Sequence, residues 1–163
     1  MKNKKVAISQ SNYIPWKGYF DMIAKSDVFV IYDDVQYTRR DWRNRNLIKT
    51  SSGLKWLTIP VVQNNYFQKI FETKISDKHW IKKHKKSLEM NYSKAKYFKQ
   101  YKDFIFEVYD TNTDSLSDLN RVFIEVICNI LDIKTEIIDS RSLNLMGDKQ
   151  ERLIQACKIL KAD

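Results

Sequence analysis

The stretch KVAISQSNYIPWKGYFDMIAKSDVFVIY, residues 5–32, holds two short apolar segments separated by a turn and a helical pattern. Lys5–Ser9 predicts a strand, which must end before Pro15 because proline has no N–H for further strand pairing. Tyr19–Lys25 predicts a short helix with one apolar face. Val28–Tyr32 is continuously apolar, which is typical of a strand buried on both faces. The stretch therefore predicts a β-α-β unit.

A β-α-β unit implies a parallel sheet with a right-handed crossover. In open sheets of this kind, ligands bind beyond the carboxyl ends of the strands. Residues 10–16 and 33–37 follow the two strands, so we expect both segments to line one cleft. Pro15 also predicts an extended backbone at Ile14.

The remaining pattern predicts one α/β domain spanning residues 1–163, with a Rossmann-like, mostly parallel sheet and a helical C-terminal half. Further strands are expected at Lys55–Val62, Ile70–Ile75 and Glu136–Ile138. Apolar residues at helical spacing predict helices that follow Asp77, cover residues 97–108, begin at Ser115 and begin at Asp148. Ser115 with Asp118, and Asp148 with Glu151, predict capping boxes.

Composition narrows the class of protein. A hydrophobic content of 43% with 13% aromatic residues excludes a disordered chain. No apolar run is long enough to span a membrane, and the apolar segment after the basic start is too short for a signal peptide, so a cytoplasmic location is expected. Cys128 and Cys157 are expected to be free thiols, and no metal site is expected from the cysteine spacing.

The net charge of +9 is unevenly distributed along the chain. Residues 1–100 hold 21 Lys and Arg against 8 Asp and Glu, whereas residues 101–163 hold 8 against 12. This asymmetry favours an anionic partner such as a nucleotide, a nucleic acid or a phosphorylated lipid. A lysine-rich composition without any partner is the alternative.

Asp33 and Asp34, directly after the second strand, are the candidate catalytic residues. A carboxylate there can bind an amine or a ribose, hold Mg²⁺, or act as a base. Alternatively, the pair caps the strand or forms ion pairs with arginine. Because side chains alternate along an extended segment, only one of the two is expected to face a given cleft.

Four arginines surround Trp42 within residues 39–45. Guanidinium groups bind phosphate or carboxylate through two hydrogen bonds, and tryptophan offers a stacking face to a base or sugar. An internal ion-pair network is the alternative. Tyr19 and Phe20 are expected in the core. The predicted substrate-binding residues are Gln10, Asn12, Tyr13, Trp16, Gln36, Tyr37, Arg40, Trp42, Arg43, Asn44 and Arg45.

Two other groups carry weaker signals. His79 and His84 are five residues apart and therefore lie off a common helical face, which argues against a metal pair. His84 remains a candidate general base. The lysines between Lys82 and Lys86 are more typical of a solvated helix face than of a nucleic-acid footprint.

The chain resembles the WbqC-like family of bacterial surface-polysaccharide gene clusters. The resemblance is carried by residues 10–20 (QSNYIPWKGYF), 29–37 (FVIYDDVQY) and 40–46 (RDWRNRN), and more weakly by 56–60 (WLTIP) and 134–140 (KTEIIDS). Ser11 departs from the proline that the family usually has there. Family members also generally continue for some sixty further residues, so a C-terminal extension is expected to be missing.

The resemblance implies a role in O-antigen production, with glycine transfer onto a sugar as a suggested activity. We therefore expect an aminoacyl or acyl transferase acting on a nucleotide- or lipid-linked amino sugar, with ATP and Mg²⁺ or a charged tRNA supplying the activated acyl group. Other polysaccharide-biosynthesis enzymes are candidate partners. The alternative is a non-catalytic module that binds an anionic glycan precursor or RNA.

Overall fold

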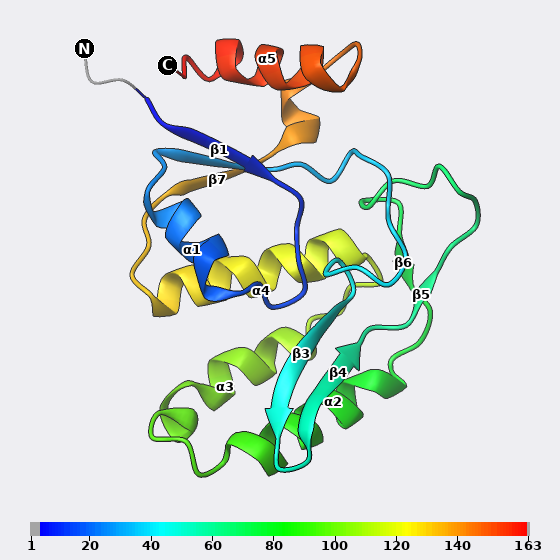
Figure 1. Ribbon diagram of the computed structural model, residues 1–163, viewed down its shortest axis with the longest axis vertical. Coiled ribbons are helices and arrows are strands. Elements are labelled where there is room, and N and C mark those ends of the chain that lie inside the picture. Colours follow the sequence, from blue (N-terminus) through cyan, green and yellow to red (C-terminus); the bar gives the residue numbers. More distant parts are fainter. Residues whose placement is uncertain (1–3, 163) are drawn as a thin grey trace.

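The computed structural model describes residues 4–162 and has an α/β fold (Figure 1). Its main sheet is entirely parallel and has the strand order β1 (Val6–Ser9), β2 (Val28–Ile31), β7 (Glu136–Asp139). The register pairs Val28 with Val6 on one side and with Glu136 on the other. All four residues of β2 are buried, as the continuous apolar run predicted. The β-α-β unit and the α/β fold are confirmed.

Helices cover both faces of this sheet (Figure 1). On one face, α1 (Lys17–Ala24) and α4 (Leu116–Ile130) form a cluster with β2 that includes Tyr19, Phe20 and Ile124, which confirms the predicted core placement of Tyr19 and Phe20. On the other face lies α5 (Lys149–Ile159), which packs through Ala156. We call β1, β2, β7 and these helices the sheet region.

A second packed unit lies on the side of α4 that faces away from the parallel sheet. It consists of an antiparallel hairpin, β3 (Arg45–Thr50) and β4 (Gly53–Thr58), together with α2 (His79–Tyr92) and α3 (Phe98–Tyr109). Its core joins side chains from the hairpin, these two helices and α4. We call this unit the hairpin region. It occupies the lower half of Figure 1.

The sequence pattern was only partly right about the central strands. The expected strand Lys55–Val62 is divided into β4 and a two-residue β5 (Val61–Val62), because Pro60 cannot donate to a ladder. Strand β3 was missed, since the polar residues on both sides hide the short apolar pair at its centre. The strand expected at Ile70–Ile75 is reduced to β6 (Lys74–Ile75).

Side-chain caps form at the starts of α4 and α5. Asp148 and Glu151 form the predicted capping box on α5. Ser115 accepts a hydrogen bond from the Asp118 N–H at the start of α4, and this is the one half of the expected box that forms. A short 3₁₀ turn, η1 (Ser140–Leu143), follows β7. None of the helices in residues 4–162 is both long and apolar enough to cross a bilayer.

Candidate functional site

The first predicted catalytic residue, Asp33, is inaccessible at the carboxyl end of β2. It is fully buried, and its two carboxylate oxygens accept hydrogen bonds from the Ser11 N–H (2.8 Å) and the Ser117 hydroxyl (2.5 Å). Burial raises the pKa of Asp33, while the bonds from Ser11 and Ser117 oppose that shift. Asp33 thereby joins β2 to the β1–α1 loop and to the start of α4.

Asp34 points away from Asp33, as expected from side-chain alternation. It accepts a hydrogen bond from the Ser140 hydroxyl (2.6 Å) and pairs with Arg152 of α5. The side chains of Asp34 and Arg152 are both mostly shielded from solvent. This pairing attaches the C-terminal helix to the end of β2, so both aspartates hold elements of the sheet region together.

The loop that follows β1 has a backbone shape that the sequence did not predict. Ile14 has φ 46°, in the left-handed region, whereas Pro15 had predicted an extended conformation. Positive φ is strained for a β-branched residue and must be enforced by neighbours. Here the Asn46 side-chain amide donates to the Tyr13 carbonyl (3.2 Å) and to the Ile14 carbonyl, and the Tyr13 N–H donates to the Trp42 carbonyl (3.0 Å).

That loop directs Tyr13 into the core of the hairpin region. The Tyr13 hydroxyl lies 2.9 Å from His84 Nδ1 and 2.5 Å from the Tyr109 hydroxyl. All three side chains are buried. Burial lowers the pKa of His84 to about 4, so its imidazole is neutral near pH 7. Burial also raises the pKa of both tyrosines.

Most of the predicted guanidinium groups are used within the fold. Arg43 donates to the Ser11 carbonyl (3.4 Å) and to the Asn12 side chain, and Arg45 lies 4.0 Å from the centre of the Trp56 ring. Arg40 is exposed, with φ 55°. Among the described residues, the one ion pair made by these four arginines joins Arg43 to Asp41 (3.6 Å), so the expected ion-pair network is not what holds the segment, and anion binding by it stays a prediction.

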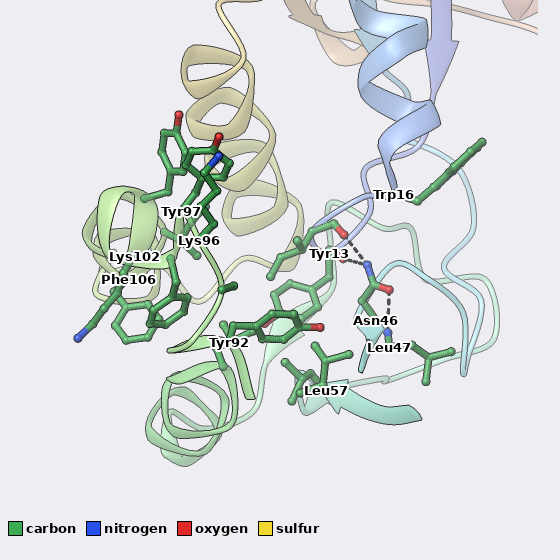
Figure 2. A pocket seen from close by; sticks show the side chains of 17 residues that line it. Tyr13, Trp16, Asn46, Leu47, Leu57, Tyr92, Lys96, Tyr97, Lys102 and Phe106 are labelled. Carbon is green, nitrogen blue, oxygen red and sulfur yellow. Dashed lines mark hydrogen bonds between the residues drawn. The ribbon is translucent and has the colours of Figure 1, made fainter. Parts of the chain in front are cut away.

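An aromatic groove of about 640 Å³ lies between the β1–α1 loop, the hairpin, α2 and α3. Figure 2 shows its side chains, with Tyr13 at the centre, Asn46 and Trp16 at one end, and Tyr97 and Lys102 at the other. Its surface is mostly apolar. A concave, apolar site with a few polar groups is the usual form of a small-molecule binding site.

A smaller hollow of about 280 Å³ adjoins this groove, and we call it the tryptophan hollow. Its lining consists of Asn12, Pro15, Trp16, Trp42 and Asn46. Trp16 and Asn46 border both spaces. Trp16 is 68% exposed and Trp42 is 46% exposed, although Trp42 also packs against Trp56 with ring centroids 5.4 Å apart. The described residues that line the two hollows include no histidine and no carboxylate.

The position of Trp16 depends on Gly18. A Cβ built on Gly18 would collide with the six-membered ring of Trp16. The indole therefore lies against the first turn of α1, where only glycine leaves room for it. Gly18 therefore permits this orientation of Trp16.

None of the hollows described here brings residues 10–16 and 33–37 together as expected, and Asp33 and Arg43 are both bonded to Ser11 in the loop after β1. Gln36 and Tyr37 border a separate hollow of about 520 Å³ beside Gln63–Tyr66. Another hollow, of about 360 Å³, is bordered by Tyr37, Arg40 and Asn44. Gln10, Arg43 and Arg45 border none of these four hollows. Only Asn12, Tyr13, Trp16 and Trp42 of the predicted site reach the aromatic groove or the tryptophan hollow.

Sequence reasoning missed most of the aromatic groove. Tyr92, Tyr97, Tyr101 and Phe106 were placed on helices but not assigned to a site. The one signal available was the density of aromatic residues between positions 92 and 106, which exceeds what one helix face needs for its core. Within residues 4–162, no group of three or more His, Cys, Asp or Glu side chains is arranged to hold a metal ion.

A model of the WbqC-like protein family matches residues 10–163. The chain belongs to the WbqC-like protein family. The match begins at Gln10, the first residue of the loop that carries Tyr13 and Trp16. This WbqC-like chain is also 51% identical over 157 residues to the Mycobacterium tuberculosis protein named "Uncharacterized protein Rv1507c", a match that covers 95% of this chain and 68% of that one. No solved structure matches it.

Proposed function

We propose that this WbqC-like protein binds an amino-sugar precursor of surface-polysaccharide assembly and transfers an aminoacyl or acyl group to it. The observation that carries the proposal is the tryptophan hollow, where two exposed indole rings meet Asn12 in a space of monosaccharide scale; the Asn46 amide N–H groups are used by the Tyr13 and Ile14 carbonyls, so Asn12 is the amide expected to bond to the sugar. Indole faces pack against the C–H faces of sugars, and amides hydrogen-bond to hydroxyl groups.

The adjoining aromatic groove supports a substrate with an extended carrier. A sugar held between Trp16 and Trp42 leaves the groove beyond Trp16 and Asn46 free for the nucleotide or lipid to which it is attached. The groove's aromatic side chains suit either a stacked base or an apolar chain. This shared border is the reason to treat the two hollows as one binding site.

The transfer itself forms an amide. With ATP, the glycine carboxylate first attacks the α-phosphate and pyrophosphate leaves, which gives the adenylate. The sugar nitrogen then attacks the acyl carbon, the bond from that carbon to the adenylate or tRNA oxygen (or to the sulfur of an acyl-CoA) breaks, the leaving atom takes the electron pair, and the nitrogen loses a proton. Asp33 and Asp34, our candidate residues for orienting the amine or accepting that proton, are held by Ser11, Ser117, Ser140 and Arg152. A role in the chemistry therefore requires one of these pairs to open.

Because both aspartates are bonded to partners within the fold, a second candidate function is favoured. It is a non-catalytic module that presents the sugar precursor to another enzyme. Such a module needs the tryptophan hollow but no general base. The absence of carboxylates and histidines from the described lining of both hollows agrees with this alternative.

Mass spectrometry distinguishes the two. The protein is incubated with UDP- and dTDP-linked amino sugars together with glycine, ATP and Mg²⁺, with glycyl-tRNA, or with an acyl-CoA. A transferase yields the glycylated or acylated sugar, and Asp34→Asn lowers the yield without abolishing sugar binding. Binding without any product supports the module.

The matched variants are Trp42→Ala and Phe67→Ala. Both side chains are exposed, but only Trp42 borders the tryptophan hollow. Trp42→Ala is expected to weaken sugar binding by about tenfold, the loss of one stacking contact, and Phe67→Ala to leave it unchanged. Equal effects, or no binding of any sugar precursor by the unaltered protein, would overturn both candidate functions.

A further inference from the structure

One segment carries almost all of the excess positive charge. Residues 78–102, which span α2, the connection to α3 and the first turn of α3, hold nine lysines, no arginine and one glutamate. Their net charge of +8 compares with +9 for the whole chain. Seven of the nine lysines are exposed. Within residues 4–162, only Lys85 and Lys102 of the nine have a carboxylate partner, so most of this charge is not neutralised by the fold.

Large apolar side chains are exposed at the same end of the molecule. Tyr92, the last residue of α2, accepts a hydrogen bond from the Lys49 N–H of β3 (3.0 Å), which fixes the hairpin turn beside the end of α2 (Figure 1). Leu54 pairs with Lys49 in the hairpin register and is 72% exposed. Met90 is equally exposed, and Tyr97 is 56% exposed.

We propose that this end, formed by residues 78–102 and the hairpin turn 51–54, docks on an anionic lipid membrane surface. We call it the basic end. Lysines near a negatively charged leaflet each raise the partitioning of a protein by about fivefold, an attraction that falls off within a Debye length. Exposed apolar side chains such as Leu54 and Met90 gain further binding by entering the interface between headgroups and acyl chains.

The residue types favour a lipid surface over a nucleic acid. Lysine is a compact point charge that is attracted by a charged surface without a required geometry, whereas arginine is the residue suited to two-pronged phosphate recognition. The basic end has nine lysines and no arginine. Its most exposed apolar groups, Leu54 and Met90, are aliphatic or thioether side chains that cannot stack on bases as aromatic rings do.

The basic end also adjoins the aromatic groove, because Lys96, Tyr97 and Lys102 belong to both. Docking would therefore place the groove next to the lipid headgroups. This position favours a lipid-linked over a nucleotide-linked sugar precursor, a step that rests on the proposed function. The docking itself does not depend on that function.

Vesicle sedimentation tests the proposal with the whole chain. The protein is expected to sediment with phosphatidylcholine vesicles that contain phosphatidylglycerol and to remain in solution with pure phosphatidylcholine, and its binding should fall steeply with salt. The triple variant Lys82→Gln, Lys83→Gln, Lys86→Gln is expected to lower the partition coefficient by about 100-fold. Leu54→Ser is expected to weaken binding several-fold without changing its dependence on salt.

The matched control neutralises three exposed lysines outside the basic end, with Lys5→Gln, Lys149→Gln and Lys158→Gln. It makes the same charge change but should retain most of the binding. Equal losses in the two triple variants would show a response to net charge alone and overturn the proposal. Binding to polyuridylic acid in the absence of any vesicle binding would also overturn it, in favour of a nucleic-acid surface.

Discussion

The sheet region and the hairpin region use polar and aromatic side chains in opposite ways. In the sheet region, Asp33 and Asp34 are each held by two partners and face no described hollow. In the hairpin region, aromatic side chains such as Tyr97 remain partly uncovered around an open groove. The two carboxylates at this strand end thus have partners within the fold, while the open groove lies where packing leaves aromatic rings exposed.

Of the changes that test this contrast, Asp33→Ala is expected to have the largest effect on stability. The change leaves the Ser11 N–H and the Ser117 hydroxyl without their buried acceptor, so the free energy of unfolding should fall by about 3 kcal/mol. Urea denaturation measures this value. The control Asp21→Ala removes an exposed i,i+4 ion pair and should change stability by less than about 0.5 kcal/mol.

The pH dependence of stability in the unaltered protein and in Asp33→Ala tests the pKa of Asp33. The pKa of Asp33 is raised in the folded state above its ordinary value of 3.8, so its stabilising contribution is complete below that value and declines as the pH rises through the folded pKa. The stability gap between the unaltered protein and Asp33→Ala should therefore narrow from acid to neutral pH. A gap that widens would mean that Ser11 and Ser117 outweigh burial and lower the pKa instead.

His84→Gln tests the buried network beneath the aromatic groove. The pKa of His84 falls from 6.5 to about 4 on folding, so the unfolded chain takes up a proton first and stability declines as the pH falls below 6.5. Between neutral pH and about pH 5, the free energy of unfolding of the unaltered protein should fall by about 2 kcal/mol more than that of His84→Gln. His79→Gln, which alters an exposed histidine, should follow the unaltered protein.

A double-mutant cycle on Tyr13→Phe and Tyr109→Phe measures how tightly the same network is coupled. Each single change leaves a buried hydroxyl or imidazole nitrogen with one partner fewer and should cost about 1 to 2 kcal/mol. The double variant should cost less than the sum, because both changes remove the same hydrogen bond. Strict additivity of the unfolding free energies would show that the two hydroxyls do not interact.

The smallest effect on stability, but a clear one on binding, is expected from Gly18→Ala. The added methyl must displace the exposed Trp16 ring, and alanine is a better helix former than glycine, so stability should change by less than about 1 kcal/mol. Affinity for UDP-glucosamine, measured by calorimetry, should fall by about tenfold because the tryptophan hollow loses one wall. Unchanged affinity would place the sugar elsewhere, most directly in the hollow beside Gln36.

The sequence predicted the sheet region better than the hairpin region. Val28–Ile31 is buried on both faces and therefore has a continuous apolar run, and Asp148 with Glu151 is a local cap that requires no distant partner. Strand β3 gave no such signal, because Ile48 is its one buried residue. The roles of the predicted site residues remain predictions, but the structure separates Gln36 and Tyr37 from Trp16 and Trp42.

By itself, the sequence determined the β-α-β start, the family and the concentration of lysine, because apolar runs, motif residues and charges are properties of short segments. Only the tertiary structure decided the left-handed backbone at Ile14, the burial of Asp33 and Tyr13, and the joining of Trp16 to Trp42 in one hollow. These features depend on contacts between residues such as Asn46 and Ile14, or Asp33 and Ser117, that lie tens of residues apart. Spacing along a chain does not encode which of two polar partners a folded core will bring together.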